Sequence, residues 1–129
     1  MTKKFYNPEG IHKPFGYSHV GEVTSGKLVL ISGQVALDKD GNVVGDDYTT
    51  QTRQVFENLK EALKAAGGTM DDIVKLNYYI LDPSHLPEIR EVRNTFLNKD
   101  SMPVSTAIGV ARLFRPEILI EVEAVAVVK

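Results

Sequence analysis

The chain has 129 residues, of which 43% are hydrophobic and 25% charged, with a formal net charge of −2 at pH 7. A chain of this length buries roughly two-thirds of its unfolded surface, so we expect a single domain over residues 1–129. It has no cysteine, which excludes disulfides, thiolate nucleophiles and cysteine-bound metals. The acidic balance gives no long-range attraction for phosphate backbones and argues against a nucleic-acid partner.

The amino terminus does not have the pattern of a targeting segment. Residues 1–4 include two lysines, but Asn7, Pro8 and Gly10 follow before any apolar run can form. We therefore expect no cleaved leader and no membrane span. Together with the missing cysteines, this favours a cytoplasmic location.

Residues 16–35 are expected to form two strands joined by a turn at Ser25-Gly26. Both faces of the second strand are apolar, which is typical of a central, buried strand. Residues 38–42 then predict a hairpin-type turn, because glycine and asparagine tolerate the positive φ that such turns require. This stretch lacks the further ligands and closing glutamate of a calcium loop.

Two amphipathic helices are expected. Apolar residues recur at helical spacing from Asp47 to Ala66, and Gly67-Gly68 is a typical left-handed end. A second helix follows Asp82-Pro83, with Ser84 as its N-cap. Arg90 and Arg93 lie on this second helix, one turn apart.

Three further strands are predicted at 73–81, 104–111 and 118–128, which gives the order β-β-α-β-α-β-β. The fold class is therefore α+β, a mixed sheet with two helices packed on one face. Two helices are too few to cover both faces, and Tyr79, Val125 and Val127 fall on the uncovered one. Subunit association is the expected cover.

Familiar catalytic and metal motifs are absent from the sequence. His12, His19 and His85 show no metal-ligand spacing. Ser32 lacks the elbow of a serine hydrolase, Ser105 has no evident histidine partner, and there is no glycine-rich phosphate loop. We expect no metal and no cofactor.

Glu121 and Glu123 are the residues most suggestive of chemistry. They are two apart on a strand, so their carboxylates project from one face about 7 Å apart and can raise each other's pKa where water is excluded. An acid/base pair is one interpretation, and salt bridges at the sheet surface or a subunit interface are the other. Tyr17 is either a pocket residue or a packed tyrosine.

The ordered motifs resemble the RidA (YjgF) family over nearly the whole chain. Gly16-Tyr17-Ser18 is similar to its early glycine-x-tyrosine element and Ile31-Ser32-Gly33-Gln34 to its central strand. Pro103, then residues 110–113 and 120–126, are similar to its C-terminal signature. The ordered combination is much more specific than any one motif.

The resemblance implies a chorismate-mutase-like fold and a homotrimer with small-molecule clefts between subunits. It also implies that Glu121 positions water for attack on an imine or enamine, while Tyr17, Ser32 and Gly33 line the cleft. Ser105 stands where the deaminating members carry the arginine that binds the substrate carboxylate. Serine cannot anchor an anion, so we expect a neutral substrate, or an anion held by another arginine: Arg90 first, then Arg93 or Arg112.

Three functions remain open. One is an imine or enamine hydrolase, similar to the 2-iminobutanoate and 2-iminopropanoate deaminases, with Glu121 as its catalytic residue and altered substrate preference. The second is a non-catalytic trimer that binds a ligand or protein partner in the same cleft. The third, an endoribonuclease as some family members are described, is disfavoured by the acidic charge balance and by the lack of a recognisable histidine pair.

Overall fold

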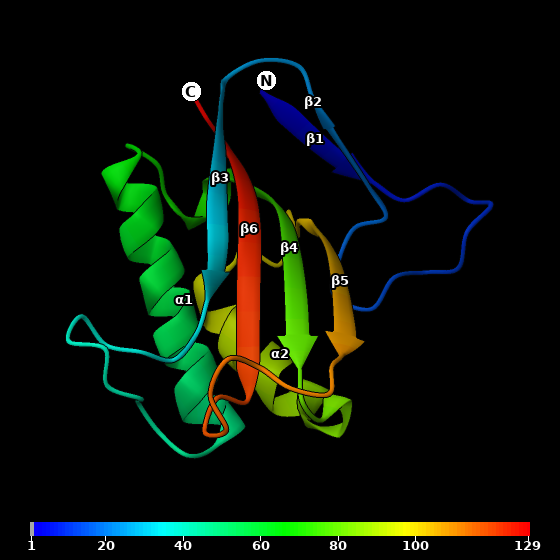
Figure 1. Cartoon of the computed structure of the whole chain (residues 1–129). Coiled ribbons are helices and arrows are strands. Elements are labelled where there is room, and N and C mark those ends of the chain that lie inside the picture. Colours follow the sequence, from blue (N-terminus) through cyan, green and yellow to red (C-terminus); the bar gives the residue numbers. More distant parts are fainter. Residues whose placement is uncertain (1) are drawn as a thin grey trace.

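The computed structural model describes residues 2–129. Its main layer is a four-stranded mixed sheet in the order β3-β6-β4-β5, with one helix to its left and one behind it in Figure 1. The strands are β3 (Lys27–Gln34), β4 (Ile73–Ile80), β5 (Val104–Gly109) and β6 (Ile120–Val128). β4 and β5 run parallel, whereas β6 is antiparallel to both of its neighbours. The predicted α+β fold with two helices on one face is confirmed.

The helices α1 (Tyr48–Ala65) and α2 (Leu86–Phe96) build the core against the sheet. Alternation along β6 directs every second side chain toward the helices, where burial of apolar surface stabilises the fold. The buried residues that meet there include Val55, Phe56, Leu59 and Leu63 of α1 and Ile120, Val122, Ala124 and Ala126 of β6. Neither helix described in residues 2–129 is long and apolar enough to cross a membrane.

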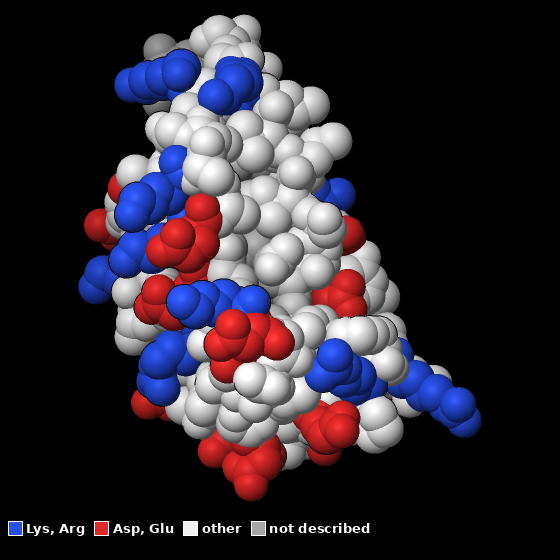
Figure 2. All heavy atoms as spheres, turned by 60° about the vertical axis from the view of Figure 1, so that its left-hand side comes forward, with Lys and Arg blue, Asp and Glu red and all other residues white. Residues whose placement is uncertain are grey.

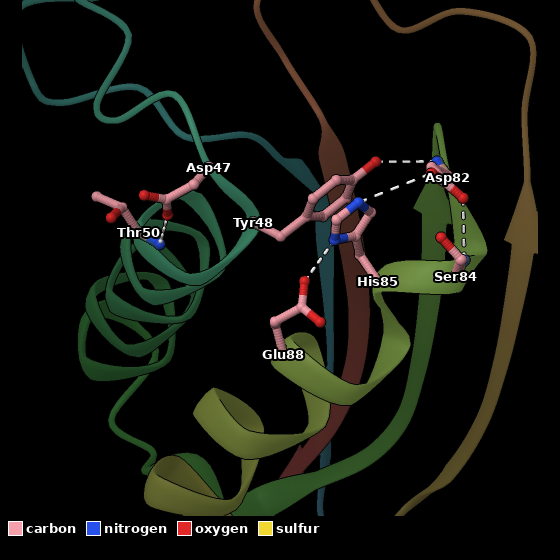
Figure 3. Close-up of polar contacts among 7 residues, drawn as sticks. All are labelled: Asp47, Tyr48, Thr50, Asp82, Ser84, His85 and Glu88. Atoms are coloured by element: carbon pink, nitrogen blue, oxygen red, sulfur yellow. Dashed lines mark hydrogen bonds and ion pairs between the residues drawn. The ribbon is translucent and has the colours of Figure 1, made fainter.

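The first turns of the two helices meet at a polar junction (Figure 3). The Tyr48 ring stacks on the His85 imidazole with centroids 4.3 Å apart, and the Asp82 amide donates to Tyr48 Oη over 2.9 Å. His85 also contacts the carboxylate of Glu88. The junction fixes where α2 begins, and α2 in turn lines the cavity described below.

The predicted N-cap at Ser84 is wrong. Ser84 lies inside the short 3-10 helix η2 (Pro83–His85), and its own amide donates to Asp82 Oδ1 over 3.0 Å. Asp82 is therefore the capping side chain, and α2 follows directly from η2. The carboxylate takes this role because Pro83 sets the backbone of the first turn and leaves the next amide free to donate.

β3 is an edge strand of the chain, not the central buried strand that its apolar faces predict. Val29 and Ile31 pack toward the helices, but Leu28 and Leu30 on the other face are 64% and 72% exposed. A strand with two apolar faces needs cover on both. Residues 2–129 cover the face of β3 that contains Val29 and Ile31, but not the face that contains Leu28 and Leu30.

The first strand predicted within residues 16–35 is present, but its pairing partner is a strand that the sequence analysis does not predict. β1 (Lys3–Tyr6) and β2 (Val20–Val23) form a separate two-stranded antiparallel sheet, at the upper right of Figure 1. β1 is short and begins with two lysines, so its alternation is too brief to be read. The pair brings the segment between them, which contains Tyr17, against the β5 edge through a bridge from Ser18 to Val104.

One of the three residues predicted on the uncovered sheet face is not exposed. Val127 is only 2% exposed, because the Ser25-Gly26 turn folds over it. Tyr79 and Val125 are half-buried. Figure 2 shows acidic and basic side chains interspersed along one side and the base of the molecule, next to a broad area without charged side chains.

Short 3-10 turns also set the start of β4. In η1 (Met70–Asp72) the Asp72 carboxylate accepts from the Thr69 amide over 2.7 Å. Asp72 is therefore a turn residue that leads into β4. Neither residue lies near the candidate site.

Candidate functional site

The predicted site residues fall into two groups on opposite faces of the sheet. Ser105 pairs in register with Leu76, which is buried under the helices, so Ser105 faces the helix side. Glu121 pairs with Tyr79 on the opposite, open side. We call the first group the α2–β5 cavity and the second the Glu121 face.

The α2–β5 cavity has a volume of about 260 Å³ and lies between α2, β5 and the segment before β2. It contains three of the predicted residues, Tyr17, Arg90 and Ser105. Tyr17 Oη contacts His12 Nε2 over 3.2 Å, which orients the phenol at one wall. Ser105 is half-buried and Arg90 is exposed. Tyr17 is therefore a cavity residue, not only a packed one.

Arg93 is the arginine that the fold buries in this cavity. It is only 8% exposed, and its Nε and Nη2 donate to Asn94 Oδ1 over 3.1 and 3.0 Å. Burial lowers the pKa of the Arg93 guanidinium, and the nearby Arg90 lowers it further. Gly16, at φ +73°, passes so close that a Cβ there would lie 2.7 Å from Arg93 Nη2, so glycine is required.

Tyr78 is a cavity residue that sequence reasoning missed. It is 4% exposed, and its hydroxyl has no hydrogen-bond partner within residues 2–129. Burial raises the pKa of this phenol. The alternation of β4 already directs Tyr78 toward the helices, and a hydroxyl on a core face is the signal that could have identified it.

Arg112 lies elsewhere. It belongs to the loop after β5, where it lines a different cavity with Phe114 and Arg115. The fold therefore separates the three arginines considered from the sequence: Arg90 and Arg93 share one cavity, and Arg112 does not.

On the Glu121 face, the two glutamates of β6 have different surroundings. Glu123 accepts from Tyr79 Oη over 2.6 Å and from Asn77 Nδ2 over 3.1 Å, and these bonds lower the pKa of its carboxyl. Glu121 has no hydrogen-bond partner in residues 2–129, and burial together with the charge of Glu123 raises its pKa. The pair is not a symmetric acid/base dyad: Glu123 is held by its neighbours and Glu121 is free.

Gly33 and Ser32 complete this face. The Glu121 carboxylate lies directly against Gly33, where any Cβ would overlap it. β3 is irregular here, because its register with β6 shifts between Ile31 and Gln34. Ser32 is exposed. The shift turns the backbone of this segment toward Glu121.

One chain does not bring the two groups together, since the sheet lies between Ser105 and Glu121. Within residues 2–129 there is also no cluster of three or more histidine, aspartate or glutamate side chains that could hold a metal ion. Each face therefore offers part of a site: a cavity with two guanidinium groups, and an unpaired carboxylate.

Fold and site together define a class of small α+β proteins in which two helices cover one face of a mixed sheet and the other face stays open. The chain belongs to the RidA/YjgF family: residues 11–128 match the family described as endoribonuclease L-PSP.

Similar proteins agree with this assignment. A RutC family protein of Pyrococcus horikoshii is 38% identical over 120 residues, which are 92% of each chain. The solved structure of YyfB from Yersinia pestis, a Rid family protein, has a TM-score of 0.90 and 39% identity over 99% of this chain and all of its own. The structure of TdcF from E. coli with bound serine has a TM-score of 0.73 and 32% identity, over 83% of this chain and 85% of its own.

Proposed function

We propose that the chain forms a homotrimer that binds a small metabolite in clefts between subunits, where Glu121 assists the hydrolysis of an imine or enamine. The observation that carries this proposal is the state of Glu121: a carboxylate without a partner in residues 2–129 and with a raised pKa, held against the backbone at Gly33. Perturbed, unpaired carboxylates of this kind are typical of general acid/base residues.

The position of the two half-sites supports an intersubunit cleft. Leu28 and Leu30 expose apolar surface on the same open face as Glu121. A second copy that covers this surface can bring its own α2–β5 cavity, with Tyr17, Arg90 and Ser105, next to Glu121. The complete site then needs two copies of the chain, which a closed ring of three provides.

The chemistry of such a cleft is straightforward. Glu121 accepts a proton from water as the water oxygen bonds to the imine carbon, while the C=N electron pair moves to nitrogen and takes up a proton. The Glu121 carboxyl then gives its proton to the amino nitrogen of the tetrahedral adduct, the C–N bond breaks to release ammonia, and the hydroxyl oxygen loses its proton to solvent as the carbonyl forms. A raised pKa suits this role, because the same carboxyl can return the proton to the leaving nitrogen.

A ligand-binding role without catalysis is the second candidate. It is favoured by Ser105, which provides no charge for a carboxylate at a position that borders the cavity. The structure of TdcF with bound serine is that of a related protein with a small-molecule ligand. We propose that this chain also takes a small molecule.

The test is an ammonia-release assay with 2-iminobutanoate and 2-iminopropanoate generated in the reaction mixture. We expect the wild type to accelerate hydrolysis and Glu121→Gln to lose about 100-fold or more, the usual contribution of a general base. Glu91→Gln, an exposed glutamate of α2, is the control and keeps full activity.

The opposite outcomes are informative. A wild type without activity on any imine favours the ligand-binding role, and a Glu121→Gln variant as fast as wild type removes Glu121 from the chemistry. RNA cleavage that Glu121→Gln abolishes would instead favour the endoribonuclease.

A further inference from the structure

Arg93 is a buried cation for which residues 2–129 provide no counter-charge. Among residues 2–129 the ion pairs involve Lys4 and His85, and none involves an arginine. The acceptor for Nε and Nη2 of Arg93 is the amide oxygen of the adjacent Asn94, which carries no charge. Burial of a guanidinium without a counter-charge is unfavourable. A bound anion would therefore stabilise Arg93 in this position.

A buried hydroxyl without a hydrogen-bond partner in residues 2–129 lies beside it. The Tyr78 hydroxyl is buried and unpartnered in residues 2–129, and the Arg93 guanidinium is close enough to influence its pKa, although no hydrogen bond of good geometry joins them. A hydroxyl without an acceptor therefore lies next to a guanidinium without a counter-charge, and an anion that enters the cavity can satisfy both. Tyr78 comes from β4 and Arg93 from α2, so packing of the helix on the sheet holds both in place.

The charged side chains that line the cavity are all positive. Its described lining contains no acidic side chain, while Arg90 adds a second cation one helical turn before Arg93. Like charges at this spacing on a helix repel each other. An anion that enters between the two arginines would relieve this repulsion.

The size of the cavity limits the ligand. A volume of about 260 Å³ lies below the roughly 300–1,000 Å³ of pockets for drug-sized ligands. A guanidinium fork matches a carboxylate with two parallel hydrogen bonds, and a phenol can donate to one of the same oxygens.

We propose that the α2–β5 cavity binds the carboxylate of a small-molecule ligand, with Arg93 as its main anchor, Tyr78 Oη as a second donor and Arg90 at the exposed end. The anion anchor is then on α2 instead of at position 105, and the ligand is an acid although Ser105 is uncharged. The inference rests on the proposed function for the place of this cavity in the cleft, but its test does not depend on catalysis.

The experiment is an NMR or calorimetric titration of the full-length protein with pyruvate, the acid left when 2-iminopropanoate is hydrolysed. Its neutral isostere pyruvamide and inorganic phosphate are the comparison probes. We expect pyruvate to bind at least about tenfold more tightly than pyruvamide. Arg93→Met should weaken pyruvate binding at least about tenfold and leave the binding of pyruvamide unchanged.

Matched variants separate binding from folding. Arg53→Met, an exposed arginine of α1, leaves pyruvate affinity unchanged, and Tyr78→Phe weakens it. Without ligand, Arg93→Met and Tyr78→Phe melt at the same temperature as wild type or higher, because the first removes a buried charge without a counter-charge and the second an unpartnered hydroxyl. Pyruvate then raises the melting temperature of wild type but not of Arg93→Met.

Several results would overturn the inference: equal affinity for pyruvate and pyruvamide, preference for phosphate, or full pyruvate affinity in Arg93→Met. A large drop in the melting temperature of ligand-free Arg93→Met would also do so, because it means that a protein carboxylate already pairs with Arg93 in the assembled protein. A different combination of results would refute the proposed function and leave this inference intact: pyruvate binds in a way that depends on Arg93, but the wild type hydrolyses no imine. If hydrolysis depends on Glu121 but not on Arg93, the proposed function stands and the role of Arg93 as carboxylate anchor is refuted.

Discussion

Glu121 and Glu123 project from the same face of β6, yet their carboxyl pKa values shift in opposite directions. The cause is the neighbouring strand. β4 places Asn77 and Tyr79 within hydrogen-bond distance of Glu123, while Glu121 lies against the bare backbone of Gly33. Spacing along one strand is therefore not enough to assign a role to either carboxylate.

The raised pKa of Glu121 has a consequence for stability. A carboxyl with a higher pKa in the folded than in the unfolded chain is costly to ionise in the fold, and this penalty is present above the folded pKa and absent below the unfolded one. We expect Glu121→Gln to raise the melting temperature at pH 8, with the gain shrinking toward pH 4. Thermal melts of both proteins across this range measure it.

The control for this experiment is Glu91→Gln, which replaces an exposed glutamate and is expected to show no such dependence on pH. If Glu121→Gln instead shifts the melting temperature equally at both ends of the range, the carboxyl is not destabilised by burial. The expected gain in stability together with the loss of activity would indicate that Glu121 is kept for function and not for folding.

Helix starts in this fold depend on aspartate side chains. Asp47 Oδ1 accepts from the Thr50 amide over 2.7 Å at the start of α1, and this bond lowers the pKa of its carboxyl. Asp82 has the corresponding role before η2, and a hydrogen bond from Ser84 lowers its pKa also. Both carboxylates satisfy amides that the first helical turn leaves without partners.

Asp47→Ala is therefore expected to lower the melting temperature by a few degrees at pH 7, because α1 carries much of the core. Since the folded pKa is lowered, the stabilisation is complete above the unfolded pKa and is lost as the pH falls through the folded one. The difference from wild type should shrink in acid. Asp47→Ser, which keeps a capping oxygen, should retain most of the stability; equal losses in both variants would show that the cap is not the cause.

The open sheet face is the feature of the whole molecule that residues 2–129 leave without cover. Leu28 and Leu30 are mostly exposed on β3, and Ile108 is 46% exposed on β5. Full burial of a leucine side chain is worth about 1.5–3 kcal/mol, so a few such residues per interface contribute strongly to association. The broad uncharged area in Figure 2 is consistent with a surface suited to a second copy.

Leu30→Lys should convert a trimer into monomers, because the charge would be buried at the proposed interface. Sedimentation at micromolar concentration measures this, and circular dichroism should show that the monomer keeps its fold, since Leu30 makes little contact within its own chain. Glu61→Lys, on the exposed side of α1, is the matched control and stays trimeric. A wild type that sediments as a monomer would contradict the intersubunit cleft.

Much of the fold can be predicted from local patterns. Apolar periodicity and the glycines near residue 67 set α1, and strict alternation sets β4 and β6, because both depend on neighbours in sequence. The order of motifs suffices for the family, which the match over residues 11–128 confirms. The paired glutamates and Tyr17 can also be recognised as candidates from their residue types and positions in the sequence.

Other features depend on contacts between distant segments, and only the tertiary structure could decide them. β3 is an edge strand because β6, the last element of the chain, pairs with it on one side only. Arg93, not Arg90, is the buried arginine because α2 packs its Ile89 and Val92 face against the sheet and carries Arg93 with it. Helical spacing places Arg93 four residues after Ile89 and three before Phe96, nearer the apolar face than Arg90, but its depth of burial depends on how that face meets β4 and β5.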